Sequence, residues 1–326
     1  MPEPTHYPDW IIWTGRREPH DGIKRLPDPP PWRRFDQRDR HRAASYRPDA
    51  AEIAAVNAAL HLRRPLLVTG KPGSGKSTLA YAIARELKLG EVLHWPINSR
   101  TTLNDGLYHY DAIARLRDAN LASANRKLAN ADPEDIGRYL SLGPLGTALL
   151  PADRPRVLLI DEIDKSDMDF PNDLLHVFEE GKFVIPELKR RGTTESVEIL
   201  PWQAEDDNQR VAITAGQVQC TTFPVVVITS NRDRELPPPF LRRCIQLKLE
   251  EPSPERLRDI VAAHLGQLDK EVVTPILEQF IEGREQGTLA TDQLLNAMYL
   301  VTKGRLPPGE EREKWLKLVF QDLGSG

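Results

Sequence analysis

The chain has 326 residues, which is enough for one large hydrophobic core, or a core with a smaller second domain, without stabilising disulfides. Its 44 lysines and arginines against 48 aspartates and glutamates give a formal net charge of -4, so only local basic patches could favour a polyanionic partner. Cys220 and Cys244 lack the spacing and clustered histidines of a zinc site, and two unpaired thiols suit a reducing compartment.

The N-terminal region is unlike the rest of the chain. Its first residues, MPEPTHYPDWIIWTG, lack the basic start and long apolar run of a signal peptide, and no later segment has the length of a membrane span, so we expect a cytoplasmic protein. Residues 1–47 are rich in proline and arginine, and the stretch DGIKRLPDPPPWRRFDQRDRHR predicts an extended arm without a regular helix. Trp10, Trp13, Trp32 and Phe35 are costly to leave in water, which favours an arm packed on its own or a neighbouring subunit over a disordered leader.

From residue 48 the pattern alternates between helix and strand. Short, uniformly apolar strands between helices predict a parallel sheet covered on both faces, hence an α/β core over residues 48–251. The expected helices are 48–62 and 76–87, and the expected strands are 65–68, 91–97, 157–161, 223–231 and 244–250. Beyond EEPSP, whose prolines end the last strand, residues 252–326 predict a small domain of four helices, at 253–265, 270–283, 291–304 and 310–324.

A phosphate-binding loop is predicted between the first strand and its helix. The segment GKPGSGKST matches G-x-x-x-x-G-K-[ST] and has the strand before it and the helix after it that such a loop requires. Backbone N–H groups of the loop would surround the phosphates, Lys76 would reach the β and γ phosphates, and Ser77 would offer its hydroxyl to Mg²⁺. The predicted nucleotide-binding residues are Gly70, Pro72, Gly73, Ser74, Gly75, Lys76, Ser77 and Thr78, with Asp161.

Two further strand ends carry polar side chains. VLLIDEIDK ends a buried strand with Asp161, expected beside Mg²⁺ together with Ser77, and Glu162, expected to polarise a water molecule. A solvated loop is the alternative for this pair, and Asp164 could equally cap a helix. VVVITSNRD ends with Asn231, whose amide could hold the attacking water, although an asparagine at a strand end is often only a turn former.

Taken together, these motifs and the proline-rich LPPPFLRRC resemble the AAA+ ATPases over residues 48–326. The stretch LGPLGTALLPADRPRVLLIDEIDKSDMDFPNDLLHVFEEGKFVIP looks most like the MoxR group, which is related to RavA and to McrB-like NTPases. The resemblance implies ATP and Mg²⁺ as cofactors, a P-loop core with a helical lid, and inserts near residues 99–145 and 181–222. It also implies a ring, expected to be hexameric.

The resemblance assigns a role to the arginines of LPPPFLRRC. Arg243 aligns with the arginine finger, which reaches into the nucleotide site of the next subunit, and Arg242 could share that work or pair with an acid. The alternative is that both are solvated charges ahead of a strand. A second family arginine, expected at the start of a lid helix, is replaced here by Asp292 and Gln293, with Arg284 or Arg305 as substitutes.

Three functions are therefore compared. The first is a MoxR-like ring ATPase that remodels or activates a protein partner, for example a von Willebrand factor A-domain protein, or acts in a bacterial conflict system. The second is an McrB-like nucleic-acid motor, supported by basic residues at 29–35 and by Lys189, Arg190 and Arg191, and opposed by the net charge of -4. The third is a non-catalytic nucleotide switch, which the presence of Asp161, Glu162 and Asn231 disfavours.

Overall fold

The computed structural model describes residues 8, 10–15, 19–124, 135–190, 196–286, 289–303, 306–307 and 309–321. Arg191, Arg305 and residues 125–134 of the first predicted insert lie outside these described residues. The chain divides into two compact units, which are described separately. One contains residues 48–70 and 76–249, and the other contains residues 1–47, 71–75 and 250–326.

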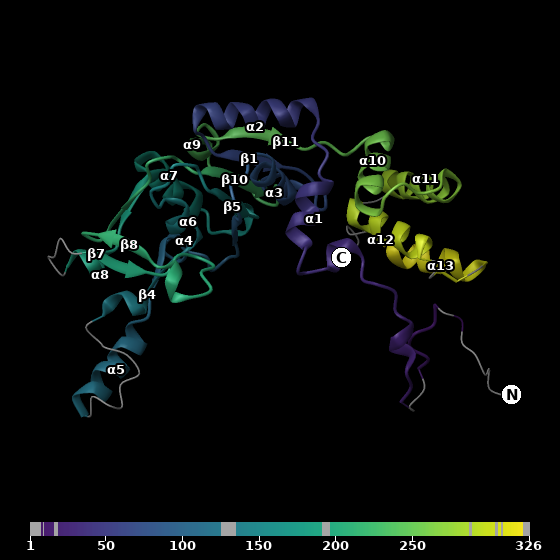
Figure 1. Ribbon diagram of the computed structural model, residues 1–326. Helices are drawn as coiled ribbons and strands as arrows, with labels where there is room; N and C mark the ends of the chain where they lie inside the picture. The colour runs from purple at the N-terminus through teal and green to yellow at the C-terminus, as the bar shows by residue number, and fades with distance from the viewer. Residues whose placement is uncertain are drawn as a thin grey trace. The chain divides into compact units, whose positions relative to one another are not determined.

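The larger unit is built on a five-stranded parallel sheet with the strand order β11-β1-β10-β5-β2 (Figure 1). The strands are β1 (Leu66–Thr69), β2 (Val92–Pro96), β5 (Val157–Asp161), β10 (Val225–Ser230) and β11 (Ile245–Lys248). Because all five strands are parallel, their carboxyl ends lie along one edge of the sheet and their amino ends along the other. We call these the carboxyl edge and the amino edge.

Both faces of the sheet are buried, as the apolar strands predicted. Alternate strand residues such as Leu67, Leu158 and Ile160 belong to a core that also contains Leu145 and Leu174 from the helices of one face. Their neighbours along each strand point to the opposite face, where α3 packs against the sheet. The helices of this unit are α2 (Ala50–Leu62), α3 (Lys76–Glu86), α6 (Pro144–Ala148), α7 (Phe170–Glu180) and α9 (Pro238–Leu241).

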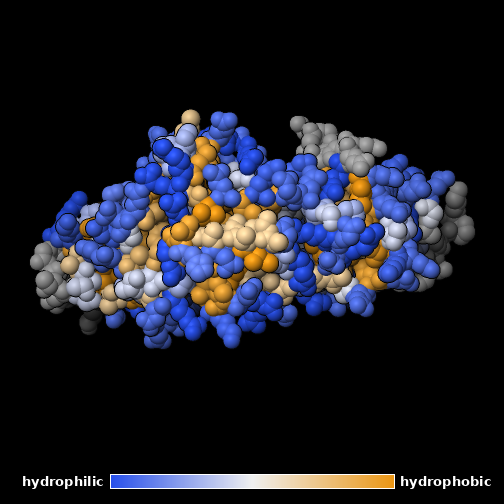
Figure 2. All heavy atoms as spheres, turned by 90° about the horizontal axis from the view of Figure 1, so that it is seen from above, coloured by the Kyte–Doolittle hydropathy of each residue, from blue (hydrophilic) through white to orange (hydrophobic). Residues whose placement is uncertain are grey.

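Helix α2 packs on β11 and β1 and leaves an apolar side exposed. Asp49 caps its first turn by accepting a hydrogen bond from the backbone N–H of Glu52, and the helix ends at Arg63, which has left-handed backbone angles. Ile53 and Leu62 are 50% and 58% exposed, and the surface over α2 appears in Figure 2 as a pale and orange band among blue residues.

The two inserts contain short antiparallel strand pairs beside the sheet. In the first, β3 (Tyr108–Tyr110) pairs with β4 (Leu140–Leu142), and the helices are α4 (Leu103–Leu107), α5 (Ala112–Ala124) and the 3₁₀ helix η4 (Ile136–Tyr139). In the second, β6 (Lys182–Val184) pairs with β9 (Gln217–Gln219) and β7 (Ser196–Ile199) with β8 (Val211–Thr214), with α8 (Pro186–Lys189) and η6 (Asp207–Gln209) between strands. Arg210 of the second insert donates hydrogen bonds to the carbonyl of Gly137 in the first insert and to that of Glu198 in its own. The two inserts are therefore linked by a hydrogen bond.

The smaller unit combines the N-terminal arm with the C-terminal helices. Its core contains Leu257, Phe280, Leu294 and Met298, and Trp32 of the arm packs against it. Its elements are η1 (Gly22–Arg25), η2 (Pro31–Arg33), α1 (Arg38–Ser45), α10 (Pro254–Leu265), α11 (Lys270–Gln286), α12 (Thr291–Thr302) and α13 (Glu310–Val319).

Within this unit the arm packs on the helices of its own chain. The Trp32 indole N–H donates to Asn296 at 3.1 Å, and its ring lies edge-on to Tyr299 and His264. His41 and His264 face each other with ring nitrogens 3.0 Å apart. These aromatic contacts cover part of Trp32, and Trp10 lies edge-on to Trp315, as expected of side chains that avoid water. For Trp13 and Phe35 the same expectation is wrong, because their side chains are 83% and 73% exposed.

A further expectation for the arm is wrong. Residues Arg38–Ser45 form the regular helix α1, within and just beyond the stretch predicted to be extended. The physical reason is the spacing of prolines: after Pro31 the next proline is Pro48, so the intervening backbone keeps every N–H donor that a helix requires.

Among the described helices, none combines the length and the apolar character needed to cross a lipid bilayer.

Candidate nucleotide-binding site

The predicted phosphate-binding loop joins β1 to α3. Gly73 and Gly75 have φ angles of +73° and +88°, in the left-handed region where a side chain would be strained. The side chain of Lys76 is buried and its Nζ donates to the carbonyl oxygen of Gly70 at 2.9 Å. Burial lowers the pKa of Lys76, and the carboxylates of Asp161 and Asp164 offset this only in part. A buried cation in such a loop favours an anionic ligand.

Asp161 is the centre of a small hydrogen-bond network at the carboxyl edge. Its Oδ1 accepts hydrogen bonds from the hydroxyls of Ser77 and Thr229, both at 2.6 Å, and its Oδ2 lies 3.3 Å from Nε2 of His94. Burial by itself would raise the pKa of this carboxyl, but the hydrogen bonds from His94, Ser77 and Thr229 outweigh it and lower the pKa to about 2. Asp161 is therefore an anion at neutral pH.

Glu162 and Asn231 lie together at the carboxyl edge of the sheet. The Nδ2 of Asn231 lies 3.5 Å from Oε1 of Glu162, a long contact, while Lys165 donates to Oε2 at 2.6 Å. This hydrogen bond to Glu162 raises the pKa of Lys165. Glu162 has a φ of +63°, and its backbone N–H donates to the Thr229 hydroxyl at 2.8 Å, which holds the residue in this uncommon conformation.

Asp164 links the two loops that carry Glu162 and Asn231. It lies in the 3₁₀ helix η5 (Ile163–Lys165), and its Oδ2 accepts hydrogen bonds from the backbone N–H groups of Asn231 at 3.1 Å and Asp233 at 3.0 Å. The side chain is buried, so these bonds are shielded from water. Asp164 was expected as a possible helix cap, but its side chain instead fixes the loop after β10.

Sequence reasoning missed Thr229, His94 and Lys165. Thr229 and Lys165 stand inside the quoted motifs, and nothing in a linear motif distinguishes a threonine that bridges two backbone segments from an ordinary strand residue. His94 lies on β2, 67 positions before Asp161, and reaches it only because β2 pairs with β5. The roles of His94 and Thr229 follow from the sheet register, whereas Lys165 pairs with Glu162 only three positions away.

The two arginines of the proline-rich segment lie at the opposite edge of the sheet. They follow α9 and precede β11, where the N–H of Ile245 donates to the carbonyl of Pro65, the residue before β1. Asp161 and Asn231 are at the carboxyl edge, so at least the length of a strand, roughly 13 Å, separates the two groups. Arg243 forms an ion pair with Glu179 of α7, and Arg242 is exposed.

Gln293, which stands where the lid arginine was expected, and Arg284, one of its two expected substitutes, are both engaged inside the smaller unit. Gln293 is buried, and its amide donates to the carbonyls of Val319 and Gln321. Arg284 donates to the carbonyl of Pro252 and lies 3.5 Å from Glu251. Both side chains thus stabilise the packing of the C-terminal helices.

The residues present fit a magnesium nucleotide. The hydroxyl of Ser74 in the loop is buried, and within the described part of the chain it has no hydrogen-bond partner. A buried hydroxyl without a partner is expected where a bound ligand would supply the hydrogen bond. Ser77 and Asp161 together offer the hydroxyl and carboxylate oxygens that Mg²⁺ prefers. A parallel sheet with this loop and these acids at its carboxyl edge defines a P-loop nucleotide-binding protein.

Comparison with known families agrees. A model of the AAA domain family, dynein-related subfamily, matches residues 65–244, which is more than half of the chain. The chain therefore belongs to this family of AAA domains, whose members are ATPases in general, and the predicted α/β P-loop fold is confirmed. A search of curated proteins found no match.

Proposed function

We propose that this protein is a ring-forming ATPase of the MoxR type that uses ATP hydrolysis to remodel or activate a protein partner. The observation that carries the proposal is the division of the catalytic groups between the two edges of the sheet. Glu162 and Asn231 lie at the carboxyl edge, and Arg243 lies at the amino edge of the same sheet. A site completed by that arginine needs a second subunit.

Each residue has a distinct task in this proposal. Bound ATP would supply the electrophilic γ phosphate, and bound Mg²⁺ would act on it as a Lewis acid. Ser77 and Asp161 hold the metal, and Lys76 neutralises phosphate charge from within the loop. Glu162 polarises the attacking water and Asn231 orients it, because their side chains face each other across the ends of β5 and β10.

Arg243 completes the site of the neighbouring subunit. A guanidinium carries a permanent charge and can bind two phosphate oxygens, which suits it to the charge that grows in the transition state. In a single chain it is paired with Glu179, and both side chains are about half exposed, so the pair is weak and exchangeable. On assembly, Arg243 would exchange the Glu179 carboxylate for a phosphate of the nucleotide bound to the next subunit.

The inserts are the proposed contact with the partner protein. Ile113 and Leu116 on α5 are 83% and 64% exposed, one helical turn apart, and the nucleotide chemistry uses neither. A von Willebrand factor A-domain protein is the partner class that we propose, in keeping with the MoxR resemblance.

Complementation between two inactive variants tests the shared site. Arg243→Ala keeps the base and lacks the arginine, whereas Glu162→Gln keeps the arginine and lacks the base. Each alone should lose at least ~100-fold in turnover, since an arginine finger supplies about 10³ to 10⁵ in related phosphoryl transfer. In a 1:1 mixture, random head-to-tail neighbours complete about one quarter of the sites, so turnover should recover to that fraction of wild type.

The control is Arg85→Ala, which removes another exposed arginine, from the end of α3, and should leave turnover unchanged at every protein concentration. Wild-type turnover per subunit should rise steeply with concentration. A mixture no more active than the sum of its two components would contradict the shared site.

A further inference from the structure

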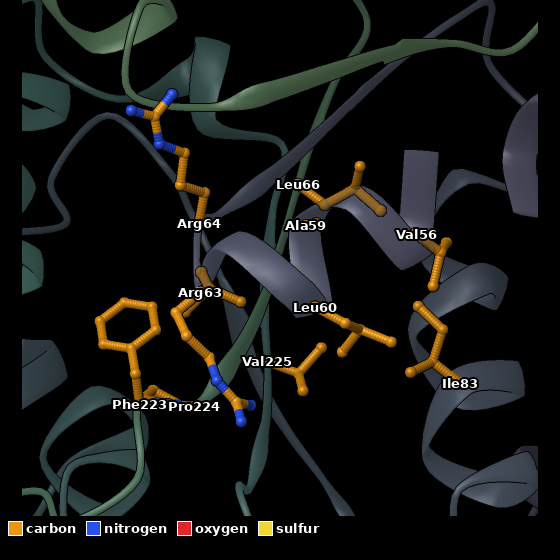
Figure 3. A pocket seen from close by; sticks show the side chains of 11 residues that line it. Val56, Ala59, Leu60, Arg63, Arg64, Leu66, Ile83, Phe223, Pro224 and Val225 are labelled. Carbon is orange, nitrogen blue, oxygen red and sulfur yellow. The ribbon is translucent and has the colours of Figure 1, made fainter. Parts of the chain in front are cut away.

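The face of the sheet that α3 covers is apolar toward the amino edge. A hollow between α2 and α3, whose lining includes Val56, Leu60 and Ile83 (Figure 3), has a volume of about 10 Å³. That is room for about one water molecule, and for no side chain or small ligand. The residues at this end of the face therefore act through packing.

His94 is a polar exception at the other end of the same face. Val92, His94 and Pro96 alternate to this face along β2, and the other two are apolar. His94 lies opposite Leu159 in the register, and Leu159 is two positions before Asp161 on β5. The side chains of His94 and Asp161 therefore leave the same face of the sheet, close to each other.

The imidazole of His94 donates a hydrogen bond to Asp161. Its Nε2 lies 3.3 Å from Oδ2 of Asp161. Because an ionised carboxylate only accepts hydrogen bonds, Nε2 carries the proton of this bond. The His94 side chain is 33% exposed, and among the described residues Asp161 is the one hydrogen-bond partner of its ring. The histidine is thus placed to act on this carboxylate.

Three donors from three elements hold the Asp161 carboxylate. The hydroxyls of Ser77 on α3 and Thr229 on β10 both donate to Oδ1 at 2.6 Å. Because these two bonds end on one oxygen, they fix that atom and not the plane of the carboxylate, whose last torsion angle is soft. The bond from His94 to Oδ2 supplies a second fixed point, and two fixed oxygens determine the plane.

That plane decides where the lone pairs of Asp161 point, beside the Ser77 hydroxyl that the site also offers to Mg²⁺. We propose that His94 is a positioning residue that sets the Mg²⁺ affinity of this site by holding the plane of the Asp161 carboxylate. Carboxylates that bind metals depend on such hydrogen-bond partners, and losing one typically costs about 10–100-fold in metal affinity. The inference rests on the nucleotide site and the ATPase that we propose above.

Three substitutions separate positioning from space filling. Leucine packs well on an apolar sheet face, so His94→Leu keeps a packed side chain and removes the donor. His94→Gln returns a donor, because the amide nitrogen of glutamine reaches about as far from the backbone as Nε2. His94→Asn is the matched control, since it carries the same amide one methylene shorter, near the place of Nδ1.

Mn²⁺ takes the same oxygen ligands as Mg²⁺, and electron paramagnetic resonance measures its binding to the full-length protein saturated with ADP, after correction for free ADP. His94→Leu and His94→Asn should weaken Mn²⁺ binding at least about tenfold, and His94→Gln should stay within roughly threefold of wild type. In ATP turnover, the Mg²⁺ concentration that gives half the maximal rate should rise by the same factor in the leucine and asparagine variants. The rate at saturating Mg²⁺ should stay within roughly threefold of wild type.

His109→Leu is the control for loss of an imidazole elsewhere. His109 is exposed on β3, and its replacement should change neither Mn²⁺ binding nor the Mg²⁺ dependence of turnover. Thermal unfolding of each variant without nucleotide should stay within a few degrees of wild type. If the leucine variant is unstable, the comparison of glutamine with asparagine decides the role.

The inference is overturned if the leucine variant is stable and binds Mn²⁺ like wild type, or if the glutamine variant binds it as weakly as the asparagine variant. A wild type that binds Mn²⁺ with ADP and does not hydrolyse ATP would refute the proposed ATPase, while the binding comparison would still decide the role of His94. A wild type that binds no Mn²⁺ with ADP would overturn both.

Discussion

Thr229 is the residue on which the geometry of the site depends most directly. Its side chain is fully buried, donates a hydrogen bond to Asp161 at 2.6 Å and accepts one from the Glu162 N–H at 2.8 Å. Valine has the same shape without the hydroxyl, so Thr229→Val removes both bonds and leaves no cavity. Thr229→Ser keeps the hydroxyl and loses one methyl group, which makes it the matched control.

The expected magnitude follows from those two bonds. An unsatisfied buried N–H costs about 1–3 kcal/mol, and a hydrogen bond to a charged group contributes about 1.5–3 kcal/mol. We therefore expect Thr229→Val to lower the free energy of unfolding by about 3–4 kcal/mol, against about 1 kcal/mol for Thr229→Ser. Because Glu162 loses the contact that holds its positive φ, turnover should fall at least about tenfold in the valine variant.

Urea unfolding at neutral pH and ATP turnover of both variants measure these effects. The pH dependence gives a second readout: because the folded-state pKa of Asp161 is lowered from 3.8 to about 2, its contribution of ~2 kcal/mol is present above pH 3.8 and is lost as pH falls toward 2. In the valine variant this loss should be smaller, because one donor is gone. Equal unfolding free energies and equal turnover for the valine and serine variants would refute the reasoning.

Two further predictions concern other groups. Glu162→Gln should retain bound ATP and stabilise the ring while turnover is lost, as measured by nucleotide retention on gel filtration; unchanged turnover would remove the role of base from Glu162. Burial, with the nearby charges of His41 and Arg47, lowers the pKa of His264 to about 4, so the unfolded chain binds more protons below pH 6.5. Stability should be full above pH 6.5 and fall by about 3 kcal/mol by pH 4, and in urea titrations His264→Gln should flatten this slope.

Much of the fold and part of the site could be predicted from the sequence, for local reasons. The apolar strands between helices predict the parallel sheet because only a sheet covered on both faces buries such runs. Parallel strands then bring Asp161, Glu162 and Asn231 to one edge, whatever the details of the loops. The glycines of the phosphate-binding loop are equally local, since positive φ at Gly73 and Gly75 is a property of the backbone.

Tertiary structure alone decided how those groups are held. Thr229, His94 and Asp164 acquire their roles through partners 67 to 69 positions away, and only the pairing of β5 with β2 and β10 brings these residues together. The N-terminal arm also combines a local signal with a tertiary one. Its aromatic residues predicted that it would pack, and only the structure shows that Trp32 packs against the core of the C-terminal helices. Local patterns specify which elements form and which ends of strands carry chemistry. Contacts between distant segments specify the conformation in which that chemistry is held, because their energies depend on distances that no linear motif contains.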